Sequence, residues 1–503
     1  MGSRRHAVGL GLIVAAGAAL RFWNIGAGYP YRIGVDEPVI AERAIAILKT
    51  GDFHPHFFDY PGLYIYTQAI VAAVRFLTGA MNGQWISLDQ FHPEHLFLWT
   101  RSLNALLGTV TILVVYRAGL RWGPRVALVG AGLMAVWLNH VRESHFALTD
   151  VPLTLLTALV LVLSLRALET GRLASFVAAG AGVGLAAATK YNGAVALVVP
   201  LLAAAASRHA RPSRVLCALG ATAAAGGAFL IAAPYTVLDL PAFLNAFAAM
   251  SASYQPRPFV EGARIYFGHL NVTLGRVGVL ALQASVLWAV ARALRERQAG
   301  RWAILLAFPL LYFQVVATKR LIFARYLLPL VPFACVLMGV LIVDAAGAIA
   351  RLKRPRAARL LAAPALVALV LFHGVRAGLA WPAQYGRRTT QDVAYRMIEE
   401  FVPPGSGVAV ENSVLRLPDS KYRARMVPRL TDRSPEEYRS LQIGFLVASS
   451  VVFGPVLANP DARPAEFAAY RRLFEEAGRC LPAATPTETV SGPEIRVCRI
   501  PLD

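Results

Sequence analysis

Charged residues, and acidic ones above all, are scarce in this sequence. Only 16% of its 503 residues are charged, and 29 Asp and Glu stand against 50 Lys and Arg, which gives a formal net charge of +21. Hydrophobic residues make up 56% of the chain. So little charge excludes an ordinary soluble multidomain protein, and a polytopic membrane protein is the class that fits.

Motifs of soluble nucleotide and nucleophile chemistry are also lacking. The sequence contains no glycine-rich phosphate loop, zinc-finger spacing or nucleophile elbow. Its excess of Lys and Arg does not predict a nucleic-acid partner, because these residues fall in short clusters between apolar runs and form no continuous basic face. Clusters of this kind are typical of signals that orient a membrane protein.

The apolar runs predict an all-α polytopic membrane protein with about 11–13 transmembrane helices. They lie near residues 7–25, 62–80, 95–119, 126–140, 150–168, 173–206, 214–234, 275–294, 302–317, 326–345 and 359–380. The run 173–206 could be two short helices broken at residues 190–193. Arg4 and Arg5 before the first run also resemble a signal peptide, but this run is long enough to span and further spans follow.

Basic loops predict the orientation of these spans, because cytoplasmic loops carry an excess of Lys and Arg. Five clusters, with the N-terminus, are therefore expected in the cytoplasm: 117–125, 166–172, 208–214, 292–301 and 351–359. The outward side then receives the first loop, 26–61, and the segments 140–150, 234–275, 318–326 and everything after 381. If 62–80 is counted as a full span, the next span runs in the opposite direction, and the basic cluster that follows it falls on the outward side. Either it is re-entrant or interfacial, or the cluster at 121–125 breaks the rule.

After Trp381 the composition becomes that of a soluble domain. Patterns predict helices at 389–402 and 464–477 and short buried strands at 408–410 and 445–450. We therefore expect a transmembrane domain over 1–380 and a small α/β domain over 381–503 outside the membrane. Cys480 and Cys498 could pair across a hairpin in an oxidising compartment, contributing about 3 kcal/mol, or could be unpaired buried thiols.

Asp36 and Glu37, in the stretch GVDEP, are two adjacent acids in the first outward loop. A carboxylate here could be a general base that removes a proton from an attacking hydroxyl. The alternative is structural: Asp36 would cap the helix that follows, while Glu37 would pair with Arg32 or Arg43.

Three more groups of polar residues adjoin membrane segments on the predicted outward side. Asp150 opens a span, where a carboxylate near lipid is a functional candidate, although a helix N-terminus also favours it. Lys190, between two short apolar runs, either snorkels to the interface or neutralises an anionic headgroup. Lys319, Arg320 and Arg325 suggest a bound phosphate or simple contact with lipid phosphates.

His54 and His56 could ligate a divalent metal, with Asp52 and Asp59 nearby. Two histidines at alternate positions lack a third fixed ligand, and a polar loop explains them equally simply. No cofactor is otherwise indicated.

Several motifs in order resemble the membrane-embedded GT-C glycosyltransferases, and among them the dolichyl-phosphate-mannose protein mannosyltransferase-like proteins and the lipid A aminoarabinose transferases. The matching stretches cover most of residues 1–380: RFWNIG, GVDEP, FDYPGLYIY, RESHFALTDVPLTLL, ATKYNGA and FARYLLPLVP. One departure is Tyr60-Pro61-Gly62-Leu63, where relatives often carry Lys-Pro-Pro-Leu. One phosphate contact must then come from another residue.

This resemblance implies that residues 1–380 are a catalytic domain. In this reading Asp36 is the catalytic base, Glu37 supports it or binds substrate, and Asp150 matches the second family acid. The phosphate would be met by four cations: Lys190, Lys319, Arg320 and Arg325. Further substrate contacts are expected from residues within the same motifs: Tyr60, Arg142, His145 and Tyr326.

The function implied is inverting transfer of a sugar from a polyprenyl-phosphate donor to an acceptor outside the cytoplasmic membrane. The acceptor could be protein, lipid or cell-wall glycan, and the partners expected are the donor, the acceptor and membrane lipids. One cationic site can stabilise the departing phosphate while one carboxylate activates the acceptor hydroxyl. A transporter or lipid flippase that uses the same charges is the alternative, although the acids cluster on one side. A binding protein anchored by its spans is a third.

Overall fold

The computed structural model describes residues 2–502 except 30, 32, 33, 35, 297, 298, 352–355, 413, 477 and 478. The chain divides into two compact units, each described here by itself. The first, called the helical unit, comprises Met1–Trp23, Thr50–Ile70 and Thr100–Pro382. The second, called the mixed unit, comprises Asn24–Lys49, Val71–Trp99 and Ala383–Asp503.

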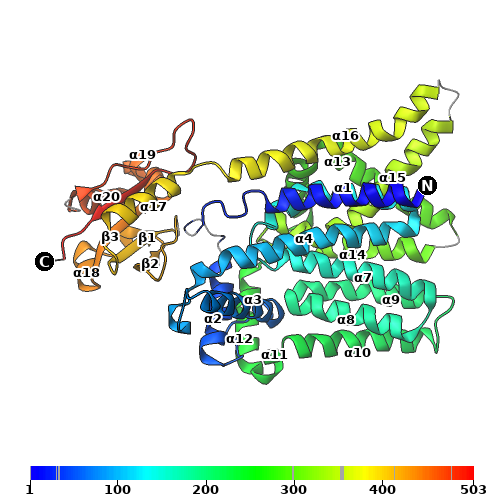
Figure 1. The fold of residues 1–503 in the computed structure, drawn as a ribbon, viewed down its shortest axis with the longest axis horizontal. Helices are drawn as coiled ribbons and strands as arrows, with labels where there is room; N and C mark the ends of the chain where they lie inside the picture. The colour runs from blue at the N-terminus through cyan, green and yellow to red at the C-terminus, as the bar shows by residue number, and fades with distance from the viewer. Residues whose placement is uncertain are drawn as a thin grey trace. The chain divides into compact units, whose positions relative to one another are not determined.

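Long helices that pack side by side build the helical unit (Figure 1). They are α1 (Gly2–Phe22), α4 (Phe97–Gly119), α5 (Pro124–Val136), α7 (Asp150–Thr170), α8 (Leu173–Thr189), α9 (Val198–Ala206), α10 (Arg214–Ala232), α13 (Phe259–Arg295), α14 (Ala299–Ala317), α15 (Val331–Arg351) and α16 (Arg356–Tyr385). Shorter pieces are α6 (Leu138–Glu143), α11 (Tyr235–Leu238), α12 (Leu240–Ser253) and the 3₁₀ helices η3 (Leu120–Trp122), η4 (Tyr191–Leu197) and η5 (Ala324–Leu330). The boundary between the two units falls inside the continuous helix α3 (Gly62–Met81), between Ile70 and Val71.

Within the described residues, nine helices are long and apolar enough to cross a membrane. The all-α polytopic prediction is therefore confirmed, and the chain is a multi-pass membrane protein. The predicted break in the run 173–206 is confirmed as well, since α8 ends at Thr189 and the 3₁₀ helix η4 begins at Tyr191.

The direction of the first helices of the helical unit follows from their contacts. Gly9 of α1 faces Leu128 of α5, and Arg21 near the end of α1 donates to the carbonyl of Ala135 at 3.0 Å. Helices α1 and α5 are therefore parallel, so α1 starts at the end where α4 finishes. At the other end, Asn104 near the start of α4 donates to the carbonyl of Leu148 at 2.9 Å.

This arrangement constrains α3. Trp23, where the first segment of the helical unit ends, and Thr100, where its third segment begins, lie at the same end of the membrane helices. Helix α2 (Glu37–Thr50) carries Glu42, Arg43 and Lys49, and it is not among the long or shorter apolar helices of the described residues. Because α2 cannot span, α3 cannot cross alone, and the re-entrant or interfacial alternative follows. Within the described residues, leaving out α3 and adding the shorter α5, α8 and the stretch of η4 with α9 to the nine candidates gives eleven crossings.

One predicted outward loop is corrected. Residues 234–275 were expected to form a loop, but the structure forms α11, α12 and the first turns of α13 there. Glu261, Arg264 and His269 lower the hydropathy of this part of α13, which hid the helix from a search for apolar runs. Gly275, at φ 68° and ψ 170°, interrupts the helix, a conformation that glycine adopts without steric cost.

Small residues let α8 and α10 approach closely. A Cβ added at Gly180 would lie 2.0 Å from the carbonyl oxygen of Ala221, and one at Gly184 would lie 2.2 Å from that of Ala225. The two helices run parallel, and this spacing of small residues is typical of tight packing inside membranes.

The mixed unit is built on a five-stranded sheet in the order β2-β1-β3-β5-β4. Its strands are β1 (Gly407–Glu411), β2 (Arg423–Val427), β3 (Ile443–Ser449), β4 (Arg479–Cys480) and β5 (Ile495–Arg499). Helices α17 (Thr390–Phe401), α18 (Pro435–Ser440), α19 (Ser450–Ala458) and α20 (Pro464–Glu476) accompany it, with the 3₁₀ helices η1 (Leu88–Gln90), η2 (Pro93–His95), η6 (Leu430–Asp432) and η7 (Pro460–Ala462). The small α/β domain predicted after residue 381 is confirmed.

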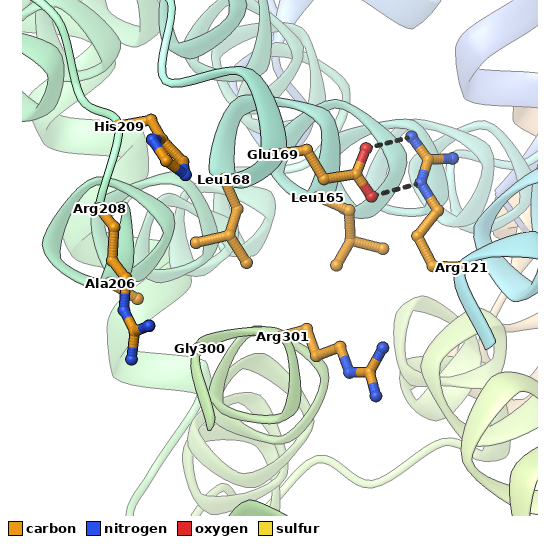
Figure 2. A pocket seen from close by; sticks show the side chains of 9 residues that line it. All are labelled: Arg121, Leu165, Leu168, Glu169, Ala206, Arg208, His209, Gly300 and Arg301. Carbon is orange, nitrogen blue, oxygen red and sulfur yellow. Dashed lines mark hydrogen bonds and ion pairs between the residues drawn. The ribbon is translucent and has the colours of Figure 1, made fainter. Parts of the chain in front are cut away.

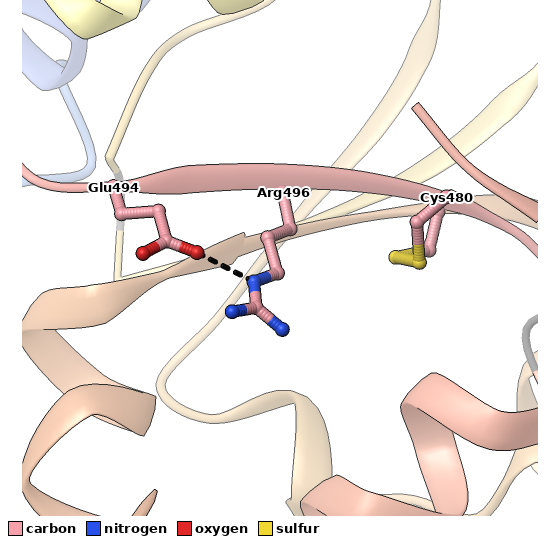
Figure 3. The surroundings of a disulfide bond; sticks show 4 residues. Cys480, Glu494 and Arg496 are labelled. Carbon is pink, nitrogen blue, oxygen red and sulfur yellow. Dashed lines mark hydrogen bonds and ion pairs between the residues drawn. A yellow bond between two sulfur atoms is a disulfide. The ribbon is translucent and has the colours of Figure 1, made fainter. Parts of the chain in front are cut away.

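Local sequence signals explain where α17 begins and how β4 is joined to β5. Thr389 caps α17 in a capping box with Asp392. Cys480 and Cys498 are register partners in the antiparallel pair β4–β5, and the structure joins them in a disulfide (Figure 3). Of the two alternatives for these thiols, the structure has the paired one.

Two segments from the first hundred residues belong to this unit, so it is wider than residues 381–503. Tyr31 donates to Asp392 at 2.5 Å and its ring packs on that of Tyr395, with centroids 4.4 Å apart. Arg416 pairs with Glu42 at 2.7 Å. The division therefore differs from a first domain that runs unbroken through residues 1–380.

Candidate functional site

A buried ion pair at the start of α7 is the centre of the polar groups in the helical unit. Asp150, the first residue of α7, is 2% exposed. Lys190 follows the last residue of α8, where the helix ends in extended backbone, and its Nζ lies 2.7 Å from Asp150 Oδ1. The break in the run 173–206 thus presents a cation to the buried acid.

A second cation and two tyrosines complete this group. Arg325 of η5 places its Nε 3.7 Å from Asp150 Oδ2. The Nζ of Lys190 lies over the ring of Tyr326 at 4.7 Å, and the hydroxyls of Tyr326 and Tyr254 are 3.1 Å apart. The structure thus brings together Asp150, Lys190 and Arg325, which are far apart in the sequence. These three contribute two cations and one carboxylate.

Glu143 is a buried acid that the sequence analysis did not select. It is 4% exposed, and its Oε1 accepts from Arg142 at 2.6 Å. Burial raises the pKa of its carboxyl, which Arg142 opposes. The signal was available, because the Arg142-Glu143 pair stands shortly before Asp150 in one motif. Arg142, a predicted substrate contact, is 38% exposed and held by Glu143.

His145 lies between two backbone carbonyl groups. The residue is fully buried, and its two ring nitrogens lie 2.9 and 3.0 Å from the carbonyl oxygens of Val141 and Trp23. Burial also lowers the pKa of its imidazole. These contacts join the segment after α6 to the residue that follows α1, and a substrate contact by His145 stays a prediction.

Lys319 and Arg320 lie in the turn between α14 and η5. Their segment runs antiparallel to residues 255–257 through backbone hydrogen bonds, such as that from the Arg320 amide to the Gln255 carbonyl at 2.8 Å. Arg320 is exposed and Lys319 half-buried. Both cations therefore lie in the turn that leads to Arg325.

Tyr60, His54 and His56 precede α3. The half-buried Tyr60 lies near Phe57, with ring centroids 6.0 Å apart. His54 Nε2 is 3.0 Å from Asp239, and His56 Nε2 is 2.8 Å from Asp52. No group of three or more His, Cys, Asp or Glu in the described part of the chain could hold a metal ion. The ring of each histidine is within hydrogen-bond distance of one aspartate.

Asp36 and Glu37 belong to the mixed unit. Glu37 begins α2, is 1% exposed, and accepts a hydrogen bond from the Gly34 amide at 2.6 Å. Asp36 is half-buried directly before the helix. Arg32, one of two basic residues considered as a partner for Glu37, lies outside the described residues. The Glu37 carboxylate thus fixes its own loop, while Asp36 occupies the position of a helix cap.

Three solved structures resemble most of the chain. ArnT from Cupriavidus metallidurans in the apo state is 16% identical, with 91% of this chain and 95% of that one covered and a TM-score of 0.59. The same protein bound to undecaprenyl phosphate is 16% identical over 97% of each chain, with a TM-score of 0.57. The Archaeoglobus fulgidus oligosaccharyltransferase in the apo form is 14% identical over 88% of this chain and 69% of that one, at 0.57.

Comparison with curated proteins found no match. A family model does match: residues 55–254 fit that of the dolichyl-phosphate-mannose-protein mannosyltransferases. The resemblance drawn from the motifs is thereby confirmed. The chain has the GT-C fold, and its residues 55–254 carry the sequence pattern of the dolichyl-phosphate-mannose-protein mannosyltransferase family.

Proposed function

We propose that the protein is an inverting glycosyltransferase that moves a sugar from a polyprenyl-phosphate donor to an acceptor outside the cytoplasmic membrane. The acceptor is a protein, a lipid or a cell-wall glycan. In this proposal the start of α1 faces the cytoplasm, as the positive-inside rule predicts, and residues 381–503 lie outside.

The observation that carries the proposal is the buried Asp150 with Lys190 and Arg325 beside it. Cations in a water-poor site stabilise a phosphate oxygen that gains charge as a glycosidic bond breaks. Asp150 holds both cations in place, and they retain excess positive charge toward an anion. Lys319 and Arg320, from the turn that leads to Arg325, are proposed as further phosphate contacts.

An apolar cavity of about 610 Å³ supports a lipid-linked donor. It is lined by α13, α14 and α15, and it includes Leu327, two residues after Arg325. Among its other lining residues are Phe259, Phe313, Val331 and Leu337. A prenyl chain suits such a lining, and the similar ArnT structure is one that binds undecaprenyl phosphate.

Asp36 is proposed as the general base. Its carboxylate would take the proton of the acceptor hydroxyl as the hydroxyl oxygen bonds to the anomeric carbon. The bond from that carbon to the phosphate oxygen breaks, and its electron pair goes to the phosphate. A single displacement of this kind inverts the anomeric configuration. Glu37 would support the loop that presents Asp36, and Tyr60, Arg142 and Tyr326 remain proposed substrate contacts.

The test is sugar transfer by the purified chain in lipid, supplied with labelled polyprenyl-phosphate sugars and candidate acceptors. Asp36→Asn should reduce the rate by about 10²–10⁴-fold, the usual contribution of a general base. Asp89→Asn, an exposed acid in the same unit, is the matched control and should keep the parent rate. No transfer by the parent from any such donor, or full transfer by Asp36→Asn, would overturn the proposal.

A further inference from the structure

A polar cavity lies at the end of α7 opposite Asp150, about 28 Å from that residue by helix rise. It has a volume of about 370 Å³, and its charged lining consists of Arg121, Glu169, Arg208 and Arg301, with His209 beside them. Figure 2 shows Arg121 and Glu169 on one side, and Arg208 and His209 on the other. The described lining thus has three guanidinium groups against one carboxylate.

Four separate basic loops supply these residues. They are the clusters at 117–125, 166–172, 208–214 and 292–301, which the positive-inside rule assigned to one side of the membrane. One shared cavity shows that the four loops meet at one end of the helical unit. That end is where lipid headgroups would lie if the helices span.

Two glycines shape the cavity. Gly171, at φ +63°, ends α7 so close to the next loop that an added Cβ would lie 1.9 Å from the carbonyl oxygen of His209. The amide of Arg211 donates to the Gly171 carbonyl at 2.8 Å, which fixes the loop that carries Arg208. Gly300 allows α14 to approach α9, since its added Cβ would lie 2.6 Å from that of Ala206.

Two of the three arginines are held by carboxylates of the described residues. The Nε and Nη2 atoms of Arg121 donate to the two carboxylate oxygens of Glu169 at 3.0 and 3.4 Å. Arg301 donates to Glu296 at 2.9 Å and lies over the rings of Trp122 and Trp302, at 5.7 and 5.5 Å. Immobilised guanidinium groups lose little entropy when they bind an anion, and their planar forks match phosphate oxygens.

We propose that this cavity binds a phosphate group at the membrane face opposite the Asp150 site. The phosphate comes either from the headgroup of an anionic phospholipid or from free inorganic phosphate. The site does not depend on glycosyl transfer, because neither Arg208 nor Glu169 belongs to the residues proposed for that reaction. Pockets of basic residues between membrane helices are known to suit lipid phosphates.

The first arm of the test detects the lipid. The full chain is placed in bilayer discs of phosphatidylcholine with a minority of phosphatidylglycerol, and native mass spectrometry counts the phosphatidylglycerol that stays bound after release. The second arm titrates inorganic phosphate calorimetrically into the full chain in pure phosphatidylcholine discs. Binding in the first arm alone identifies a lipid headgroup, and binding in the second identifies free phosphate as a ligand.

Three variants decide whether the cavity is responsible. Arg208→Gln should weaken binding about tenfold, the value of one charge-assisted hydrogen bond. Glu169→Gln should tighten it, because it removes the competing carboxylate, and a purely structural role would not tighten binding. Arg172→Gln, on the same face but outside the lining, should bind as the parent does. The proposal is overturned if neither probe binds, or if the three variants bind alike.

Discussion

At the scale of single residues, the pairing of Asp150 with Lys190 is the contact on which both stability and the proposed chemistry depend. The two are 40 residues apart in sequence, and their side chains are 3% and 13% exposed. Removing one partner from a buried pair leaves an uncompensated charge, which costs more than the pair itself contributes.

Lys190→Met should therefore destabilise the chain by about 3–5 kcal/mol. Asp150→Asn should do the same, because it leaves Lys190 and Arg325 without their carboxylate. The double variant should recover part of the loss, since it leaves only Arg325 to compensate. Unfolding of the full chain in detergent measures this, with the exposed Lys49→Met as control. Strictly additive losses in the double variant would contradict a direct pair.

Glu411 provides a second residue-scale prediction, in the mixed unit. Its carboxylate is fully buried and accepts from the amides of Leu430 and Ser449, both at 2.9 Å, and from the hydroxyl of Tyr470 at 2.5 Å. Glu411→Ala leaves three buried donors without an acceptor and should lower the free energy of unfolding by about 3–5 kcal/mol. Limited proteolysis of the full chain should then cut residues 383–503 faster, while the exposed Glu488→Ala keeps the parent pattern. Equal cleavage of the two variants would refute the role of Glu411.

The sequence allowed candidate site residues to be predicted, but not the contacts among them. Asp150 and Lys190 were selected because charges beside apolar runs are costly, and Arg325 because cations on the predicted outward side suggest a bound phosphate; the structure brings these three together. Glu143 was passed over because burial of an acid depends on its three-dimensional neighbours. His145 was selected from its motif, yet backbone carbonyls occupy its ring, a contact no sequence pattern encodes.

At the scale of elements, prediction depended on how uniform each apolar run was. The break after Thr189 was predictable, because Lys190, Asn192 and Gly193 interrupt an apolar run. The early part of α13 was not, because its polar residues resemble a loop when hydropathy is the only guide. The interruption of α13 at Gly275 was not predictable either, because glycines are common throughout membrane helices.

The contact between α8 and α10 yields a prediction at this scale. Gly184→Leu places a side chain where the carbonyl of Ala225 now lies, so the helices must separate. We expect a loss of about 1–3 kcal/mol or more, as for other overpacked interiors. Thermal unfolding in detergent measures it, with Gly226→Leu as the control, because an added Cβ there meets nothing within 4 Å. A parent-like melting temperature for Gly184→Leu would count against the close contact.

At the scale of the whole molecule, the number of crossings determines which segments share a side of the membrane. The sequence left this open at 62–80, since length and composition cannot distinguish a span from an interfacial helix. Contacts of α1 with α5, which follows shortly after α4, settle the direction of these helices, because they show that α1 ends at the end of the helical unit where α4 begins.

Labelling of introduced cysteines in sealed vesicles tests this topology. Phe53 precedes α3 and Ile86 follows it, and the two are 63% and 90% exposed. Phe53→Cys and Ile86→Cys should react with an impermeant maleimide from the same side, and Arg172→Cys from the opposite side. The native Cys217 and Cys335 are buried, and Cys480 and Cys498 are bonded to each other. Labelling of Phe53→Cys and Ile86→Cys from opposite sides would establish α3 as a true crossing.

The composition of the mixed unit from early and late segments has a consequence for the timing of biosynthesis. Tyr31 and Asp392 are 361 residues apart, and Arg416 and Glu42 are 374 apart. A ribosome that adds about 5–20 residues per second needs roughly 20–70 s to make the later partner after the earlier one. For that interval the GVDEP segment has been made, but the later residues that contact its flanks, Asp392 and Arg416, have not, so the unit that carries Asp36 can be completed only after the last membrane helix has emerged.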